Sequence, residues 1–476
     1  MSQRVFYKQI LHHFPHQPTD DQIKAVSHLD VFEQSAKKNP VYMLKGFAGT
    51  GKTSLISAYV QMLATNNKKF MLLAPTGRAA KVLSKYTGKK AHTIHRYIYH
   101  ITTSSDGFYN IQLAHNRLKN TVFIIDEASM ISDNNRSNGD LFGSRNLFED
   151  LISYVFSNEQ NKMVLVGDTA QLPPVGLNIS PALDLQYIKS SFNVTAYEFE
   201  MKEVMRQELD SGILTTATNL RKLISQNDLV STLFAKADFK SDIQEVDDGR
   251  TFEELLHETF DHLSLEQGII VCRTNKRANL FNRQVRNNIL YRESEIEGGD
   301  ILMIVKNNYY WLDKDAKAGF IANGDIVNVV RILKTEEMYG FQFADADIRL
   351  ADYPEEKEIT VKLLLSTLYS EGPGLSNSDR NILFKRIEED YADMPERNKR
   401  IAEVMKSPWH NALHVKFAYA MTCHKTQGGQ WPYVFIDQGY LTEEMVNTEY
   451  LRWLYTAVTR STKKVYLVNF NRSFFA

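Results

Sequence analysis

Short apolar runs alternate with helical patterns along most of the chain. Each run is followed by a turn and then by a segment with the periodicity of a helix. The clearest runs cover residues 41–44, 70–73, 122–125, 163–166, 268–272 and 464–468. This alternation predicts an α/β fold with parallel strands buried between helices on both faces of a sheet. No run approaches the roughly 18 apolar residues of a membrane span, so we expect no membrane insertion.

Two regions depart from this rhythm. Residues 98–118 contain Ser-Ser-Asp-Gly between two alternating segments, which predicts a β-hairpin inserted in the first α/β domain (residues 1–97 and 119–210). Residues 329–409 show short alternating strands and then a charged helical stretch. They predict a small β-barrel-like module with a helical arm, inserted in a second α/β domain (residues 211–328 and 410–476).

Composition adds limits to this picture. The 476 residues are 43% hydrophobic and 24% charged, which excludes fibrous and wholly disordered classes. The formal net charge is −1, but residues 329–409 hold 12 Lys or Arg against 16 Asp or Glu, which leaves +3 on the remainder. Cys272 and Cys423 are the two cysteines, so neither a disulfide framework nor a cysteine metal site is supported. Because His, Pro and charged residues interrupt the amino-terminal segment, we expect no secretory signal and a cytoplasmic location.

A glycine-rich segment directly after the strand at 41–44 carries the strongest chemical signal. It fits the pattern GxxxxGK[ST] and leads into a helical stretch, the context that a phosphate-binding loop requires. Its residues are Gly46, Phe47, Ala48, Gly49, Thr50, Gly51, Lys52 and Thr53. The backbone N–H groups would surround the phosphates of ATP, Lys52 would reach the β and γ phosphates, and Thr53 would ligate Mg²⁺.

Two further strand ends carry polar residues suited to hydrolysis. Asp126 and Glu127 end the run at 122–125, where ligands of α/β sheets bind. We expect Asp126 to hold Mg²⁺ and Glu127 to orient and deprotonate the attacking water. Gln171 follows the run at 163–166 and is expected to contact the γ phosphate or its water. Hydrolysis of a nucleoside triphosphate follows from these residues together.

The order and spacing of these segments resemble the superfamily 1 helicases. Further matches are closer to the superfamily 1B branch, which contains RecD, Pif-type and Dda-like helicases. They cover residues 74–80 (motif Ia), 93–95 (motif Ib), 204–207 (motif IV), 420–428 (motif V) and 455–460 (motif VI). The resemblance implies two RecA-like P-loop domains, with the module at 329–409 being SH3-like. A Pif-type element beyond motif II is not evident, so the subgroup stays open.

The resemblance also implies roles for individual residues. Gln22 would read the adenine, and Gln427 and Gly428 would lie near the nucleotide. Arg206 and Arg460 would approach the γ phosphate, with Arg460 as the arginine finger of the second RecA-like domain. The implied contacts to the DNA strand are Pro75, Thr76, Thr93, His95, Thr422, His424 and Lys425. The hairpin would separate the strands of the duplex, with Phe108 and Tyr109 stacking on the junction.

These assignments predict an ATP-dependent DNA helicase that uses ATP and Mg²⁺ and moves 5′ to 3′ on single-stranded DNA. Single-stranded and forked DNA are the expected partners of a monomer, and single-strand-binding, replication or repair proteins are candidate protein partners. Two alternatives stay open: a translocase that remodels protein–DNA complexes, and an RNA helicase of the same superfamily. A nuclease has little support, because no carboxylate cluster remains once Asp126 and Glu127 are used.

Overall fold

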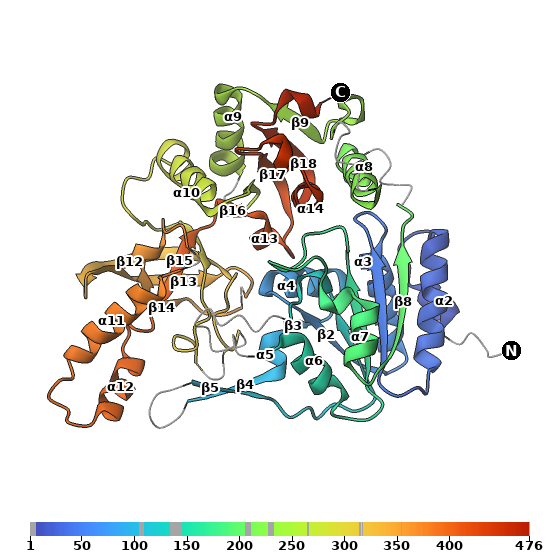
Figure 1. Ribbon diagram of the computed structural model, residues 1–476, viewed down its shortest axis with the longest axis horizontal. Helices are drawn as coiled ribbons and strands as arrows, with labels where there is room; N and C mark the ends of the chain where they lie inside the picture. Colours follow the sequence, from blue (N-terminus) through green and yellow to red (C-terminus); the bar gives the residue numbers. More distant parts are fainter. Residues whose placement is uncertain are drawn as a thin grey trace.

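The computed structural model describes residues 6–103, 109–133, 145–204, 211–226, 233–263, 266–313, 316, 318–353, 355–372 and 374–475. Two parallel sheets with surrounding helices form two of its parts, and a closed barrel with a pair of helices forms another (Figure 1). The α/β fold class predicted from the alternation of strands and helices is therefore confirmed.

The first sheet has six parallel strands in the order β3-β2-β6-β7-β1-β8. Its strands are β1 (Pro40–Gly46), β2 (Lys69–Ala74), β3 (Ala91–Thr93), β6 (Thr121–Ile125), β7 (Lys162–Gly167) and β8 (Thr195–Met201). Successive strand residues point to opposite faces, so Met43 packs in the core with α6 and Leu44 in the core with α3. Because both faces are buried there, the inner strands β1, β6 and β7 are nearly continuous apolar runs.

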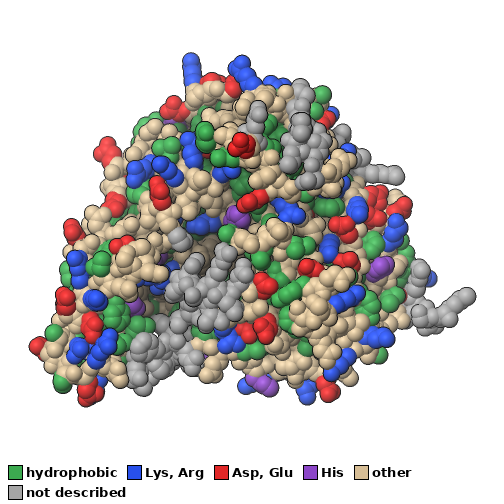
Figure 2. Space-filling view, in the orientation of Figure 1, with side chains coloured by type: hydrophobic (Ala, Val, Ile, Leu, Met, Phe, Trp, Pro, Cys, Tyr) green, Lys and Arg blue, Asp and Glu red, His purple; other side chains and the backbone are tan. Residues whose placement is uncertain are grey.

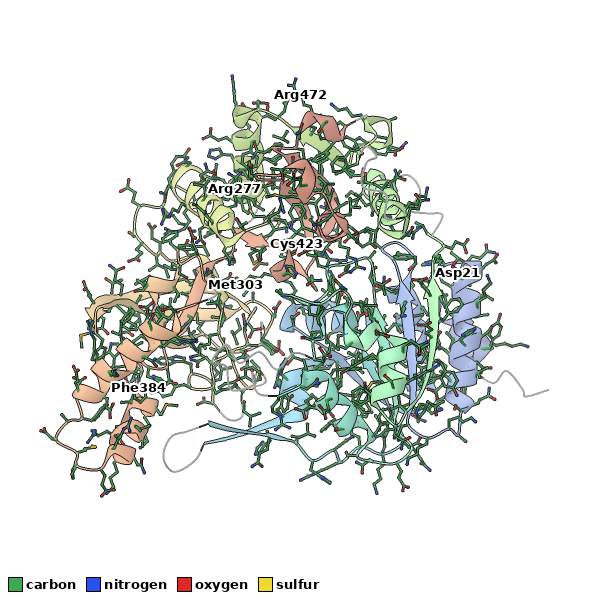
Figure 3. The ribbon with its side chains drawn as sticks, viewed as in Figure 1. Asp21, Arg277, Met303, Phe384, Cys423 and Arg472 are labelled. Carbon is green, nitrogen blue, oxygen red and sulfur yellow. The ribbon has the colours of Figure 1, made fainter. Side chains whose placement is uncertain are left out.

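Helices cover both faces of this sheet (Figure 1). They are α1 (Tyr7–His12), α2 (Asp20–Gln34), α3 (Lys52–Thr65), α4 (Gly77–Thr87), α5 (Ile94–Ile98), α6 (Leu147–Phe156) and α7 (Leu185–Ser191). The Asp21 carboxylate near the start of α2 accepts the backbone N–H groups of Lys202 and Glu203, directly after β8, at 2.8 and 3.1 Å (Figure 3). Helix α2 is thereby joined to the end of the edge strand β8.

The second sheet has five parallel strands in the order β16-β10-β17-β18-β9. Its strands are β9 (Ile243–Val246), β10 (Gly268–Cys272), β16 (Ala420–Thr422), β17 (Trp431–Asp437) and β18 (Ser461–Val468). The accompanying helices are α8 (Gly212–Gln226), α9 (Gly249–Leu256), α10 (Asn275–Gln284), α13 (Cys423–Thr426) and α14 (Thr448–Val458). Cys272 and Cys423 are both buried and free. Cys423 lies on the side of this part that faces the first sheet (Figure 3).

The barrel closes in the order β11-β12-β13-β14-β15. Its strands are β11 (Ile301–Ile304), β12 (Ile326–Met338), β13 (Phe341–Leu350), β14 (Ile359–Leu364) and β15 (Leu413–Phe417). Leu302 of β11 pairs with Phe417 of β15, so the barrel begins before and ends after the predicted module at 329–409. Closure requires the first and last strands to pair, and the sequence pattern of each resembles an ordinary buried strand.

Two helices between β14 and β15 form an arm on the barrel (Figure 1). They are α11 (Asn377–Glu389) and α12 (Arg397–Lys406). Leu383 and Ile387 of α11 and Val404 of α12 pack with Phe343 and Leu364 of the barrel in one small core. The arm is therefore attached by apolar burial, although its helices are rich in charged residues.

A two-stranded antiparallel sheet extends from the first part of the molecule. It pairs β4 (Tyr99–Thr103) with β5 (Tyr109–Leu113), with Tyr99 opposite Leu113. The predicted turn and Phe108 lie outside the described residues.

The surface shows no separation of charge on the face seen in Figure 2, where Lys and Arg side chains are interspersed with Asp and Glu. Within the described ranges, no helix is both long and apolar enough to cross a membrane.

Candidate active site

The predicted phosphate-binding loop connects β1 to α3. Gly49 and Gly51 have φ values of 75° and 79°, in the left-handed region that glycine adopts without steric cost. A Cβ at Gly46 would lie 2.9 Å from Thr50 Oγ1, so the loop also closes tightly on itself. These two requirements explain why glycine occupies these positions. The loop leads to the amino-terminal end of α3, where the helix dipole gives a partial positive charge.

The loop forms part of a cavity of about 710 Å³ that lies between the two sheets. The first sheet and its loops contribute residues 47–49, 51–54, 126–127, 167–168 and 171 to the wall, and the second contributes residues 428–430 and 459–463. Lys52 lines the cavity, and its ammonium donates to the carbonyl oxygens of Gly46 and Phe47 at 2.7 and 2.9 Å. Thr53 lies beside it at the start of α3. A nucleotide-sized site thus requires both sheets.

Asp126 and Glu127 emerge into this cavity at the end of β6. The Asp126 carboxylate accepts the Tyr86 hydroxyl at 2.6 Å and the Glu127 N–H at 2.9 Å. Burial raises the pKa of Asp126, while the hydrogen bond from Tyr86 and the charge of Lys52 act in the opposite direction. Carboxylates held in a low-dielectric wall interact strongly with cations, which fits a magnesium site.

Glu127 has an unusual backbone conformation for a non-glycine residue, with φ at 53°. Such a conformation costs of order 1–3 kcal/mol and persists where the surroundings enforce it. Burial raises the pKa of Glu127, and the positive charge of Arg460 opposes that shift. The carboxylate is therefore a stronger base than an exposed one, as deprotonation of water requires.

Tyr86 was not among the residues predicted from the sequence. It lies on α4 and its hydroxyl orients Asp126, with burial as the main cause that raises its own pKa. The sequence contains no local signal for this contact, because Tyr86 occupies an ordinary position in a helix 40 residues before its partner.

Gln171 lies in the loop after β7 and lines the cavity. Its side chain is buried, and its Oε1 has no hydrogen-bond partner within the described part of the chain. A buried carbonyl oxygen is costly to leave unpaired, so this atom is suited to accept a hydrogen bond from water in the site.

A tyrosine from the second sheet joins the loops of the first. The hydroxyl of Tyr455, on α14, accepts the N–H of Ala48 at 2.8 Å and donates to the Asp168 carboxylate at 2.6 Å. The residue is buried, and burial raises its pKa. One hydroxyl thus connects the phosphate-binding loop, the end of β7 and the second sheet. Although the motif containing Tyr455 was noted in the sequence, no role was assigned to this side chain.

Two neighbouring hydrogen bonds strengthen the same junction. The N–H of Leu172 donates to the Thr456 hydroxyl at 2.8 Å, and the Gln427 amide donates to the Leu172 carbonyl at 2.7 Å. Gln427 therefore faces the loop after β7, while Gly428 lines the cavity itself. Arg221 of α8 lies 4.3 Å from the centre of the Phe47 ring and adds a cation–π contact between the two parts.

Arg460 is the cationic residue of motif VI on the cavity wall. Its side chain is buried and donates to the carbonyl oxygens of Thr456 and Gly429 at 3.0 and 3.3 Å. These contacts hold the guanidinium opposite the phosphate-binding loop. The second predicted arginine, Arg206, lies outside the described residues.

Gln22 lies behind the phosphate-binding loop and does not line the cavity. Its amide oxygen accepts the Thr19 N–H at 2.9 Å, and its amide nitrogen donates to the Thr50 carbonyl at 3.1 Å. The residue caps the start of α2 and supports the loop, and its role in reading adenine stays a prediction.

The predicted DNA contacts on the side of the first sheet lie at the starts of two helices. The Thr76 hydroxyl accepts the Ala79 N–H at 3.2 Å and caps α4, directly after Pro75. The Thr93 hydroxyl accepts the Arg96 N–H at 3.4 Å and caps α5. Burial lowers the pKa of His95, in the first turn of α5, to about 4. A neutral imidazole can donate and accept hydrogen bonds without adding charge.

The predicted DNA contacts on the side of the second sheet lie at the start of α13. Thr422 is its N-cap residue. Burial lowers the pKa of His424, and the nearby Glu449 and the backbone of Pro173 act in the opposite direction. Burial lowers the pKa of Lys425 to about 8, with a smaller contribution from Lys416. Of the predicted wedge residues, Phe108 lies outside the described residues, and Tyr109 is placed on β5 by its backbone alone.

Motif V and motif Ia meet directly. Gly428 has a φ of 72°, and a Cβ there would lie 2.9 Å from Ala79 Cβ and 3.1 Å from Thr76 Oγ1. A larger residue would separate the two parts at this point. The two parts therefore meet at a seam formed by Thr76, Ala79 and Gly428, and Gly428 also lines the cavity.

Two family models match this chain. Residues 19–229 match an AAA domain, and residues 417–468 match a UvrD-like helicase C-terminal domain. The first match contains the phosphate-binding loop and both carboxylates, and the second contains Gly428 and Arg460. Each match covers less than half of the chain, and together with the curated relatives they show that the chain is similar to the superfamily 1B helicases. The family resemblance inferred from the motifs is thereby confirmed.

Curated and solved relatives extend the comparison. It is 25% identical over 444 residues to the ATP-dependent DNA helicase dda of Enterobacteria phage T4, covering 89% of this chain and 93% of that protein. It is 30% identical over 181 residues to the ATP-dependent RecD2 DNA helicase of Deinococcus radiodurans, covering 37% of this chain and 21% of that protein. A solved structure of Pif1 helicase from Bacteroides with ADP-AlF3 and ssDNA matches with 12% identity and a TM-score of 0.47, covering 97% and 95% of the two chains.

Proposed function

We propose that the protein is an ATP-dependent DNA helicase that moves 5′ to 3′ on single-stranded DNA. The observation that carries this proposal is the cavity between the two sheets, where the phosphate-binding loop and carboxylates of one face Arg460 of the other. The dda helicase, similar over most of both chains, supports DNA as the substrate. The 5′ to 3′ polarity rests on the superfamily 1B resemblance.

The cavity residues divide the chemistry of hydrolysis among them. Thr53 and Asp126 would hold Mg²⁺, and the buried carboxylate and adjacent hydroxyl fit an ion that prefers oxygen ligands. Bound there, Mg²⁺ would offset the charge of the phosphates. Glu127 takes a proton from the attacking water, and the unpaired oxygen of Gln171 orients that water. Lys52 and Arg460 stabilise negative charge that builds on the transferred phosphoryl group.

Movement follows from the way the two sheets are joined. ATP binding draws Arg460 and the phosphate-binding loop together, and product release lets them separate. Tyr455, Thr456 and Gln427 transmit this change to the seam, where Thr76 is a candidate contact to the DNA strand. The grip of each sheet on the DNA phosphates would then alternate, because the two sets of contacts belong to different sheets.

The remaining parts take roles within this mechanism. We assign residues 1–97 with 119–210 and residues 211–300 with 418–476 to two RecA-like domains, and residues 98–118 to the hairpin that separates the strands; the second domain is corrected from 211–328 with 410–476 because β11 and β15 belong to the barrel. The barrel and arm form an SH3-like module. We propose a monomer in the cytoplasm that acts on single-stranded and forked DNA.

Unwinding of tailed duplexes tests the proposal. With ATP, the protein is expected to unwind a duplex with a 5′ single-stranded tail and to leave a 3′-tailed duplex intact, while Lys52→Ala unwinds neither. Preference for the 3′ tail would contradict the polarity. ATPase stimulation by DNA without unwinding would favour the remodelling translocase, and stimulation by RNA alone would favour an RNA helicase.

A further inference from the structure

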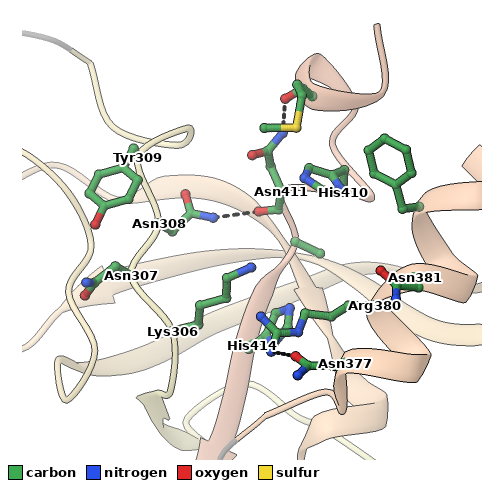
Figure 4. A pocket seen from close by; sticks show the side chains of 13 residues that line it. Lys306, Asn307, Asn308, Tyr309, Asn377, Arg380, Asn381, His410, Asn411 and His414 are labelled. Atoms are coloured by element: carbon green, nitrogen blue, oxygen red, sulfur yellow. Dashed lines mark hydrogen bonds between the residues drawn. The ribbon is translucent and has the colours of Figure 1, made fainter. Parts of the chain in front are cut away.

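A second cavity, of about 570 Å³, lies between the barrel, the arm and the loop after β11 (Figure 4). Its wall is formed by residues 306–309 of the loop, residues 377, 380–381 and 384 of α11, and residues 405, 410–412 and 414 before and within β15. It shares no residue with the ATP cavity. None of the described residues lining it is acidic, although the surrounding module carries a net negative charge.

The charge of this pocket comes from two cations on different elements. Lys306 lies on the loop and Arg380 on α11 (Figure 4). Burial lowers the pKa of His410 to about 4 and that of His414 to about 3, and Lys306 contributes to both shifts. Arg380 contributes to the shift of His414. Both histidines are therefore neutral at pH 7, so Lys306 and Arg380 are the cationic side chains among the described residues of the wall.

The wall is held in place by its own hydrogen bonds. The Asn308 amide donates to the Asn411 carbonyl at 2.7 Å, and the Asn411 amide donates to the carbonyl oxygens of Met405 and Ser407 at 2.7 and 2.9 Å. Phe384 packs edge to face on His410, with 5.8 Å between the ring centres. The pocket thus combines cations, amides and an aromatic ring on a preorganised frame.

The loop that forms one wall of the pocket packs against the first α/β part, near the helix that carries the candidate DNA contact His95. The Tyr309 ring lies 5.0 Å from the Phe320 ring, and Phe320 is buried in the core that contains α5. Arg96 of α5 donates to the carbonyl of Ala316 in the same loop at 3.5 Å. The loop therefore connects the pocket to the helix that carries His95.

We propose that this pocket binds one nucleotide unit, a phosphate with its base, outside the ATPase site. Lys306 and Arg380 recognise the phosphate as charged donors, and Phe384 with the side-chain amides of Asn307 and Asn381 receives the base. No described residue of the wall is a carboxylate that could hold Mg²⁺ or activate water, so the pocket binds without hydrolysing. The volume suits one nucleotide, not an extended peptide.

A free nucleoside monophosphate and one unit of a DNA strand present the same chemistry. The connection to α5 favours a DNA strand as the ligand. The pocket would then be a DNA contact on the arm, separate from the seam at Gly428. The strand assignment rests on the proposed function. Binding of a free mononucleotide does not depend on it.

Calorimetric titration of dTMP into the full chain, with the ATP cavity saturated by a non-hydrolysable ATP analogue, tests the pocket itself. We expect one additional site, weakened roughly tenfold or more in Arg380→Gln, because a charge-assisted hydrogen bond is lost. Asn381→Asp keeps the size of an exposed side chain and adds a negative charge, so it should weaken binding without a change in melting temperature. Lys385→Gln removes one charge from the same helix outside the pocket and serves as the matched control.

Photocrosslinking of an oligonucleotide carrying 5-iododeoxyuridine distinguishes the two sources. Crosslinks mapped to peptides containing Tyr309 or Phe384, and lost in Asn381→Asp, identify a DNA strand. Binding of dTMP without such crosslinks identifies a free nucleotide. Absence of both, or binding of a glutamate-rich peptide in place of dTMP, would overturn the proposal. Loss of unwinding alone would leave the dTMP result intact, so failure of the helicase function is recognised separately.

Discussion

The two walls of the ATP cavity are built in different ways. The wall from the first sheet contains the phosphate-binding loop and two strand ends, and two of its charged groups have partners on the same side of the cavity: Lys52 on its own loop and Asp126 with Tyr86. The wall from the second sheet presents Arg460 and is joined to the first by a few hydrogen bonds around Tyr455. The difference indicates that nucleotide binding is a local property, whereas hydrolysis depends on how the sheets meet.

Removal of the cation on the second wall is expected to have the largest effect. Arg460→Ala should lower kcat for ATP roughly a thousandfold, the size typical of an arginine finger. The KM for ATP should change by no more than a few-fold, because the phosphate-binding loop stays intact. Steady-state kinetics with saturating DNA measure both values. A large rise in KM with kcat preserved would show that the second wall takes part in binding.

Loss of the base on the first wall is expected to be nearly as large. Glu127→Gln should lower kcat by about a hundredfold or more, the usual contribution of a general base. Because burial raises the pKa of Glu127, the parent should lose activity on acidification at a higher pH than an exposed glutamate would cause. The pH profile of kcat/KM measures this loss of activity at low pH. If Glu127→Gln shows the same loss at low pH, another group causes it.

The joint between the walls is expected to give an intermediate effect. Tyr455→Phe removes only the hydroxyl that contacts Ala48 and Asp168, so kcat should fall about tenfold while the fold is retained. More ATP should also be consumed for each base pair unwound, since the link between the walls is weakened. Parallel ATPase and unwinding assays give this ratio. An unchanged ratio would mean that Tyr455 acts only on local structure.

A side chain at Gly428 is expected to disturb the contact between the two parts by steric clash. Gly428→Ala places a methyl group 2.9 Å from Ala79 Cβ and should reduce DNA-stimulated ATPase several-fold. Gly88→Ala is the matched control, since Gly88 has a similar φ of 66° and open space around it. That variant should lose only about 1 kcal/mol of stability. Equal ATPase defects in the two variants would remove the seam from the mechanism.

The smallest expected effect concerns Lys425. Burial lowers its pKa to about 8, so its charge is present at pH 7 and lost as the pH rises through that value. The affinity for a single-stranded oligonucleotide should therefore fall roughly threefold between pH 7 and pH 9, because one screened phosphate contact is worth about 1 kcal/mol or less. Lys425→Arg should reduce this dependence. An identical pH dependence in that variant would place the titration elsewhere.

Much of the fold could be predicted because the signals are local. The apolar runs that become β1, β2, β6, β7, β10 and β18 are buried on both faces, so each is visible as a short hydrophobic segment. The boundaries of the barrel were harder to predict from the sequence, because β11 and β15 pair with each other across a long stretch of chain. A strand that closes a barrel has the same pattern as one inside a sheet, and only its partner distinguishes the two.

The candidate site divides in the same way. Residues 46–53 and the pair Asp126 and Glu127 could be identified from the sequence, because a turn, a helix start and a strand end have local requirements for glycine, lysine and carboxylate. The roles of Tyr86 and Tyr455, and the burial of Gln22 behind the loop, were decided by the tertiary structure. Each of these side chains is defined by a contact with a residue far away in the chain. Such contacts depend on how the layers pack, which no local pattern records.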